Sequence, residues 1–515
     1  MSRRAKIIAT LGSSTEGVER LTALLEAGVD AVRLNFSHGT QQEHAGRIEH
    51  VRQAAERAGR TVAILQDLRG PKLRTGPTRD GQPVHLITGR RVRLSAEPTP
   101  TTPETISIPY PALARDLRPG ARILLRDGEI QLQVERVDGN DILAEVITGG
   151  ELGPAAGVHF PGLRLSAEAL TEKDLGDLAF GLQHGVDAVA LSFVRQPEEV
   201  RAVRRAIGDR AAGDVRPWVI AKIERAEALD HLPGILAEAD GVLVARGDLD
   251  LEVTAERVPS LQKHIIRQAN AAGRIVITAT EMLESMIHPP RPTRAEVSDV
   301  ANAVFDGSDG LMLSGETAVG DYPIEAVKVM DRIILDAERN SAFDGPGDAV
   351  IEDDAEATAR AAWALASDRN VAAIAVFTRS GRTALLMAKA RPPVPILAFT
   401  PEPETLRRLN LCWGVEPHLV PLAGSVEAMT EGPSRRSKDR SEPSPGSRSC
   451  SSPVYRSVPW GRPTSRCCTA SGRRCPAQRT TGRLSGASPA DRTASPVLKR
   501  GSKPCCELEA GAHGS

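Results

Sequence analysis

Four short apolar runs in the middle of the chain each end in charged or hydroxyl side chains. These runs, which lie between residues 217 and 316, read WVIAKIE, GVLVARGD, IVITATE and LMLSGET. Their apolar, β-branched openings are typical of strands buried on both faces of a sheet. The side chains at their ends are Lys222 with Glu224, Arg246 with Asp248, Thr280 with Glu281, and Ser314 with Glu316. Because the carboxyl ends of parallel strands meet at one rim, where such folds bind ligands, we expect these side chains to form a site.

Glu224 and Asp248 are the candidate metal ligands of this rim. They end neighbouring runs, and two carboxylates completed by substrate oxygens and water suit an octahedral Mg²⁺ ion. The alternative is a structural ion pair with Lys222 or Arg246, since such pairs also gather charged groups at a rim. The residues alone leave both interpretations open.

A second polar group follows an earlier run, RLNFSHG, which supplies Arg33, Asn35, Ser37 and His38. Side chains alternate along a strand, so Arg33, Asn35 and Ser37 are expected on one side. The alternative is that Ser37 only caps the next helix.

Positive charge gathers after the third run. Asp67 ends that run, and Arg69, Lys72 and Arg74 follow it. This much positive charge at one rim predicts a phosphate group. The segment Gly310–Thr317 has the glycine spacing of a Walker loop, but a glutamate stands where the lysine is needed. We therefore expect side chains and metal, rather than a Walker loop, to bind the phosphate.

Eight strand-like runs alternate with helix-like segments and position these groups. They are AKIIATL, DAVRLNF, TVAILQD, VDAVALSF, PWVIAKI, GVLVARG, RIVITAT and GLMLS. Eight β/α units predict an α/β fold with a closed (β/α)₈ TIM barrel, formed by residues 1–71 and 166–340. The segment 72–165 changes to short alternating strands with Asp-Gly turns. We interpret it as an inserted small β-barrel domain that acts as a lid.

A partial C-terminal α/β domain is predicted over residues 341–430. Within it, the loop after the strand VAAIAVF has hydroxyls, arginines and backbone N–H groups at a helix start, which favours a phosphate site. This candidate effector loop consists of Thr378, Arg379, Ser380, Gly381, Arg382 and Thr383. The alternative is a helix cap with surface charge.

Residues 431–515 differ in composition from the rest of the chain. They hold 16 basic and 6 acidic residues, six of the seven cysteines, and few large apolar residues. We predict a disordered tail, because such a segment buries too little apolar surface to become ordered. The change near 424–431 resembles an out-of-frame translation, and the cysteine spacing does not favour a zinc site.

Charge and cysteine usage limit the partners. Residues 1–430 hold 49 basic and 60 acidic residues, which argues against nucleic acid as a partner. No apolar run has the length of a membrane span or of a signal peptide. The single cysteine before the tail, Cys412, fits a reducing compartment, so we expect a cytoplasmic protein.

Several of these motifs together resemble the pyruvate kinase family. They are RLNFSHG, KIE, ARGDL, TATEMLESM, RPTRAEVSDVANAVFDG and SGETAVGDYP, and the similarity runs in order over residues 3–420. The resemblance implies a barrel, an inserted lid domain and a C-terminal α/β domain with tetramer and effector contacts. It also implies phosphoryl transfer from phosphoenolpyruvate to ADP, giving pyruvate and ATP.

The resemblance also implies roles for individual residues. Lys222 would stabilise the transferring phosphoryl group and the enolate oxygen, and Glu224 and Asp248 would bind Mg²⁺ or Mn²⁺. Gly247, Asp248 and Thr280 would bind the substrate carboxylate, and Thr280 lies near the carbon that is protonated. Arg33 and Arg74 would bind phosphates, and Ser192 and Phe193 would form part of the pocket wall. The nucleotide would be bound by Asn35, Ser37, His38 and Lys173. The effector loop would bind sugar phosphates.

The chain departs from the family pattern at several positions. Glu281 stands where glutamine is usual, and Asp250 where glycine is usual. The ligands of a monovalent cation would be Asn35, Ser37 and Asp67. Leu68 and Lys72 stand where potassium-requiring members have threonine and glutamate. We therefore predict that the ammonium group of Lys72 replaces K⁺, which is not required.

Two other functions stay open. One is a related metal-dependent barrel lyase that acts on a 2-oxo acid, which would need neither the lid nor the group around Asn35, Ser37 and Asp67. The other is an inactive remnant that serves as a binding subunit. The presence of every implied active-site residue argues against the remnant.

Overall fold

A closed barrel of eight parallel strands forms the centre of the molecule. The computed structural model describes residues 3–166, 168–208, 216–341, 354–368, 370–422 and 448–450. The strands neighbour one another in the order β1-β16-β15-β14-β13-β12-β3-β2. They are β1 (Lys6–Thr10), β2 (Ala31–Asn35), β3 (Ala63–Asp67), β12 (Ala188–Leu191), β13 (Trp218–Ile223), β14 (Gly241–Ala245), β15 (Ile275–Ala279) and β16 (Gly310–Leu313). The eight strands predicted from the apolar runs are thus confirmed.

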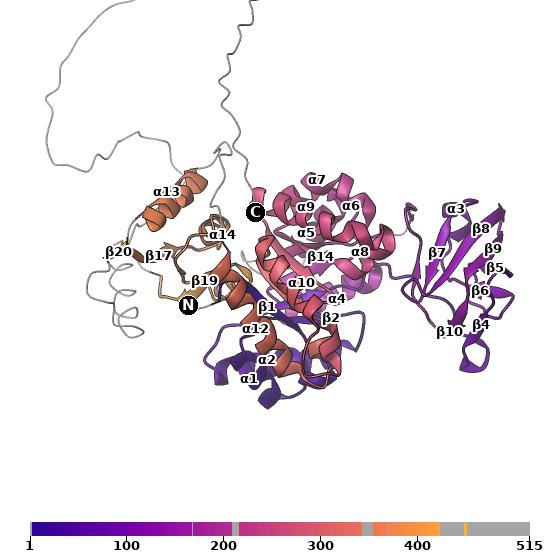
Figure 1. Cartoon of the computed structure of the whole chain (residues 1–515), viewed down its shortest axis with the longest axis horizontal. Coiled ribbons are helices and arrows are strands. Elements are labelled where there is room, and N and C mark those ends of the chain that lie inside the picture. The colour runs from indigo at the N-terminus through magenta and orange to yellow at the C-terminus, as the bar shows by residue number, and fades with distance from the viewer. Residues whose placement is uncertain are drawn as a thin grey trace, which may run out of the picture. The chain divides into compact units, whose positions relative to one another are not determined.

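Helices surround the barrel strands (Figure 1). Three of them begin with a Ser/Thr capping box, in which Thr40, Thr171 and Thr293 each accept a hydrogen bond from a backbone N–H three residues on. This arrangement satisfies N–H groups that have no partner within a helix. The helices are α1 (Val18–Glu26), α2 (Gln41–Arg57), α4 (Glu172–Gln183), α5 (Pro197–Gly208), α6 (Ala226–Asp230), α7 (Leu232–Glu238), α8 (Arg246–Glu252), α9 (Val258–Ala271), α10 (Arg294–Phe305), α11 (Gly315–Ala318) and α12 (Pro323–Asn340).

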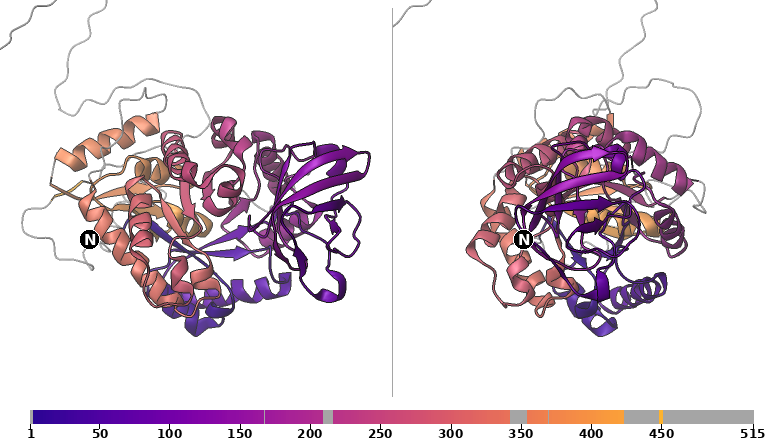
Figure 2. Two further views of the ribbon diagram at one scale, coloured as in Figure 1. Left: turned by 45° about the vertical axis from the view of Figure 1, so that its right-hand side comes forward. Right: turned by 90° about the vertical axis from the view of Figure 1, so that its right-hand side faces the viewer.

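The segment between β3 and α4 is a body of short strands (Figure 2). A six-stranded sheet has the order β11-β7-β8-β9-β5-β6, and β10 pairs with β4. Side chains of β9 alternate between buried and partly exposed, as expected for a sheet with one face on a core. The elements are β4 (Val84–Leu86), β5 (Arg91–Ser95), β6 (Thr105–Ser107), α3 (Leu113–Asp116), β7 (Arg122–Leu125), β8 (Ile130–Asp138), β9 (Asp141–Thr148), β10 (Gly150–Leu152) and β11 (Val158–His159).

A smaller α/β domain follows the barrel. Its parallel sheet has the order β19-β18-β17-β20. Its elements are α13 (Asp354–Asp368), β17 (Val371–Phe377), α14 (Arg382–Lys389), β18 (Ile396–Thr400), α15 (Pro403–Arg408), β19 (Val415–Leu419) and β20 (Arg448–Cys450). The tail predicted to be disordered, 431–515, lies outside the described residues except for β20.

No helix among the described residues is long and apolar enough to cross a membrane.

Candidate active site

The ammonium group of Lys222 lies at the centre of the candidate site, near the carboxyl end of β13. Its Nζ is 2.8 Å from Oε1 of Glu224 and 3.4 Å from Oδ1 of Asp67. It also donates a hydrogen bond of 2.8 Å to Oγ of Ser192, which in turn donates to the carbonyl of Leu68 at 2.7 Å. The ends of three neighbouring strands, β3, β12 and β13, thus surround one cation.

Burial and charge shift the pKa values of this group. Burial alone would lower the pKa of Lys222, but the carboxylates of Asp67 and Glu224 outweigh it and raise this pKa. Burial raises the pKa of Glu224, and the nearby carboxylate of Asp248 raises it further, while Lys222 opposes both. Lys222 is therefore a cation, and the charge of Asp248 disfavours ionisation of Glu224.

The loop after β12 supports Glu224 through its backbone. The N–H of Phe193 donates a hydrogen bond of 2.8 Å to Oε2 of Glu224. Phe193 adopts a φ of 57°, a region that costs free energy for a bulky residue. A Cβ on Gly70 would lie 3.0 Å from the Phe193 ring, so glycine allows the two loops to approach closely.

Arg33 and Asp67 form an ion pair on the adjacent strands β2 and β3. The Nη2 of Arg33 lies 2.6 Å from Oδ2 of Asp67, and its Nη1 donates to Oγ1 of Thr10 at 3.2 Å. Asn35 is the register partner of Asp67, so the three predicted residues lie together at one rim. The carbonyl oxygen of the Asn35 side chain accepts a hydrogen bond of 3.1 Å from the Ser37 N–H. Thr40, rather than Ser37, caps the next helix.

The segment after β15 is held in an unusual backbone conformation. Thr280 and Glu281 have φ values of 71° and 51°. The Oγ1 of Thr280 accepts a hydrogen bond of 3.0 Å from the Gly247 N–H. Arg246 donates to the carbonyls of Ala279 and Thr280 and pairs with Asp299 at 2.6 Å. Gly247 and Thr280 thus lie in contact, whereas Arg246 binds the backbone and Asp299 rather than Glu224 or Asp248.

The carboxylates of Glu224 and Asp248 suit a hard divalent cation. They follow the ends of the paired strands β13 and β14, and the charge of Asp248 raises the pKa of Glu224. Among the described residues, no group of three or more His, Cys, Asp or Glu side chains could hold a metal ion. Two protein carboxylates with remaining positions open to substrate and water are typical of Mg²⁺ sites.

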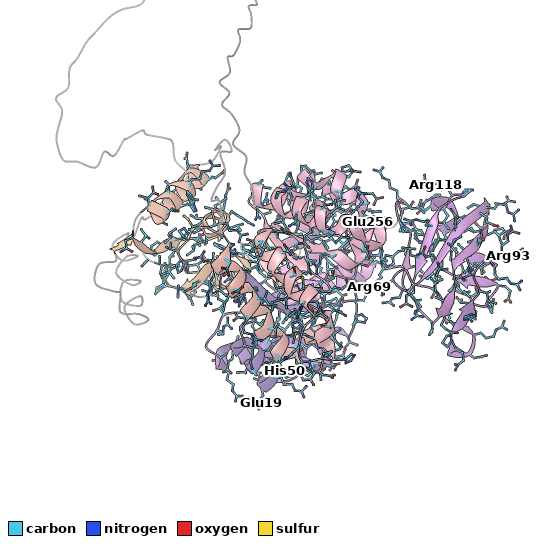
Figure 3. All side chains as sticks on the ribbon, in the orientation of Figure 1. Glu19, His50, Arg69, Arg93, Arg118 and Glu256 are labelled. Atoms are coloured by element: carbon cyan, nitrogen blue, oxygen red, sulfur yellow. The ribbon has the colours of Figure 1, made fainter. Side chains whose placement is uncertain are left out.

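A rim of positive charge adjoins these groups. Burial lowers the pKa of His38, and the charges of Arg74, Lys72, Arg33 and Arg69 lower it further. Arg69 lies on the segment that leaves β3 toward the inserted strands (Figure 3). Such a cluster of cations attracts phosphate oxygens.

Two residues that were predicted to bind the nucleotide form contacts within the protein instead. Arg74 donates to the carbonyl of Ala155 at 2.9 Å. Lys173 donates to the carbonyl of Phe36 at 3.0 Å and pairs with Asp177.

The predicted effector loop lies in the C-terminal domain and runs from the end of β17 into the first turn of α14. Gly381 precedes α14 with a φ of 91°, and its N–H donates to Oγ1 of Thr378 at 2.9 Å. Arg379 pairs with Glu402 at 2.9 Å. The remaining residues of this loop are Ser380, Arg382 and Thr383.

Contacts that support the site were not evident from the sequence, even where the residue itself, such as Glu316, had been singled out. Glu316 is fully buried and accepts hydrogen bonds from the backbones of Leu283 and Ser314 at 2.9 and 2.6 Å. The buried pair of Arg225 and Glu252 joins residues far apart in the chain. A charged residue beside a recognised motif does not reveal its partner before the fold is known.

Comparison with known families agrees with this geometry. A family model for the pyruvate kinase barrel domain matches residues 2–327, and one for the pyruvate kinase alpha/beta domain matches residues 356–440. The chain belongs to the pyruvate kinase family. The second match extends beyond residue 424, where the composition begins to change.

Relatives that share the family name cover most of the chain. A pyruvate kinase of Geobacillus stearothermophilus is 44% identical over 440 residues, which are 84% of this chain and 74% of the relative. One of Mycobacterium intracellulare is 44% identical over 429 residues, which are 83% of this chain and 90% of the relative. The crystal structure of a pyruvate kinase from Cryptosporidium parvum superimposes with a TM-score of 0.81 at 35% identity, covering 85% of this chain and 91% of that one.

Proposed function

We propose that this enzyme transfers the phosphoryl group of phosphoenolpyruvate to ADP and releases pyruvate and ATP, as a phosphotransferase (EC 2.7.1.40). The single observation that supports the substrates best is the environment of Lys222. A permanently charged ammonium group lies between Asp67 and Glu224 at the carboxyl rim of the barrel. A cation held there in advance stabilises charge that develops on a phosphoryl or enolate oxygen.

Glu224 and Asp248 are the proposed ligands of Mg²⁺ or Mn²⁺. When bound, the metal would offset negative charge on the substrate and the phosphoryl group. Asn35, Ser37 and Asp67 form the proposed monovalent-cation region, where the ammonium group of Lys72 would replace the cation.

The other residues of the site would bind and orient the two substrates. Gly247, Asp248 and Thr280 would bind the substrate carboxylate, and Arg33 would bind the phosphate. Asn35, Ser37, His38, Arg74 and Lys173 form the proposed nucleotide side. Thr280 would lie next to the carbon of the enolate that is protonated.

The experiment is to incubate the purified protein with phosphoenolpyruvate, ADP and Mg²⁺ and to measure pyruvate and ATP together. Equal amounts of both support the proposal. The barrel lyase is not favoured, and cleavage of a 2-oxo acid without any use of ADP would reveal it. Pyruvate without ATP would contradict phosphoryl transfer to ADP.

We propose that the protein is a cytoplasmic homo-oligomer, and that it forms the tetramer expected from the family. Cys412 is buried with a free thiol, and burial raises its pKa to about 12, which suits a reducing compartment. Light scattering of the purified protein tests the oligomer.

A further inference from the structure

Two linkers join the inserted domain to the barrel, and the return linker, residues 160–166, carries an unusual set of contacts. The side chain of Leu163 is buried in the apolar core of the inserted domain. Its carbonyl oxygen instead accepts a hydrogen bond of 2.7 Å from Nη2 of Arg225. One residue is thus part of the inserted domain through its side chain and bound to the barrel through its backbone.

Arg225 is bound in turn by Glu252, and the two form a buried ion pair. They are 6% and 7% exposed. Nη1 of Arg225 donates to Oε1 of Glu252, while Oε2 of Glu252 accepts a long hydrogen bond of 3.5 Å from the Gly162 N–H. A buried ion pair constrains geometry, because losing one partner leaves the other charge without its main counter-charge. A second carboxylate, that of Glu227, lies 3.5 Å from Nε of Arg225.

The positions of the pair in the chain connect it to the proposed metal ligands. Arg225 follows Glu224 directly, and Glu252 lies one helical turn after Asp248 in α8. We propose that Arg225 and Glu252 form a tether that holds the return linker against the two strand ends carrying Glu224 and Asp248, and so positions the inserted domain over the site. This proposal rests on the proposed function for its kinetic part and on contacts alone for its structural part.

Two neighbouring features support the tether. Arg195, two residues after Phe193, donates to the carbonyl of Leu165 at 2.5 Å and pairs with Glu199. A cavity of about 40 Å³ lies beside the linker and is lined by Arg195, Arg225 and residues of both linkers. Two arginines therefore bind alternate carbonyls of the linker, those of Leu163 and Leu165.

The test is hydrogen exchange of the ligand-free protein, with Arg225→Met and Glu252→Ala as variants. The control is Arg204→Met, which removes another arginine that pairs with a carboxylate, Asp240, at 2.9 Å and donates to a backbone carbonyl. We expect amide exchange in peptides over residues 160–166 to rise at least tenfold in both test variants and to change less than twofold in the control. Unchanged exchange in the linker would overturn the tether. If Arg225→Met does not fold, Glu252→Ala decides.

Steady-state kinetics separate positioning from general stability. We expect kcat to fall about tenfold in Arg225→Met while the KM for phosphoenolpyruvate changes less than threefold, and Arg225→Lys to restore part of kcat. A fall in thermal stability with normal kcat in the folded fraction would overturn the positioning role. A wild-type protein that makes no pyruvate would contradict the proposed function but leave the exchange result valid.

Discussion

The guanidinium group of Arg33 lies 2.6 Å from one carboxylate oxygen of Asp67, and the other oxygen faces Lys222 at 3.4 Å. Burial would raise the pKa of Asp67, but Lys222 and Arg33 together lower it. Asp67 is therefore ionised and lies between two cations that belong to the protein. This relationship bears directly on the need for an added monovalent cation.

Activity is expected without added K⁺. The charge of Lys72 acts on His38 together with that of Arg33, so a fixed cation already contributes to the field in this region. Assays in buffer free of K⁺ and Na⁺ should give at least half of the rate measured with K⁺. Lys72→Glu should create a requirement for K⁺, whereas Arg79→Glu, at an exposed position of the inserted domain, should not. A strict requirement in the wild type would show that Lys72 does not replace the ion.

Removing a proposed metal ligand should abolish most of the activity. Glu224→Ala deletes one of two carboxylates, and a loss of several kcal/mol of charge stabilisation corresponds to about a thousandfold in rate. The Mn²⁺ affinity, measured by electron paramagnetic resonance, should fall as well. Asp250→Asn changes an exposed carboxylate two residues from Asp248 and serves as the control. Near-normal turnover of Glu224→Ala would end the metal assignment.

The stability of the protein should depend on pH through Glu252. Burial raises the pKa of Glu252 from 4.5 to about 7, although Arg225 opposes this. A raised pKa means that the stabilisation is complete below pH 4.5 and is lost as the pH rises through 7. Glu252→Gln cannot ionise, so its free energy of unfolding relative to the wild type should increase between pH 5 and 8, by at most about 3 kcal/mol. Denaturant unfolding of both proteins measures this, and a difference that is constant with pH would contradict it.

Sugar phosphates should activate the enzyme weakly or not at all. In the effector loop, Arg379 pairs with Glu402, and the Gly381 N–H donates a hydrogen bond to Thr378. The composition of the chain changes near residue 424, soon after the end of β19. An effector needs different affinities for two states of the protein. The phosphoenolpyruvate concentration at half-saturation should shift less than twofold on adding a sugar bisphosphate. A sigmoidal curve that becomes hyperbolic would show that the loop is functional.

The order of the tail is a separate prediction. Hydrogen exchange across residues 440–510 should be fast, and slow exchange there would indicate an ordered segment.

Sequence patterns predicted the barrel well because each of its strands is a short, mainly apolar run that can be recognised without knowing its partner strand. The strand ends carrying Lys222, Glu224 and Thr280 followed directly from these runs, since parallel strands must present their carboxyl ends at one rim. The family resemblance supplied the roles of these residues. The supports of the site were not predictable in the same way. Arg246 with Asp299, and Arg225 with Glu252, are pairs separated by many residues, and only the folded chain brings them together.

The environment of Lys222 offers the most direct test of the proposed activity. Pyruvate formation from phosphoenolpyruvate, ADP and Mg²⁺ should be compared between the wild type and Lys222→Met, with circular dichroism to confirm that both are folded. The wild type should form pyruvate and ATP in equal amounts, and Lys222→Met should lose about a thousandfold or more in kcat, because the cation acts on charge that develops in the transition state. A folded wild type that forms no pyruvate, or a Lys222→Met variant with the full rate, would contradict the account.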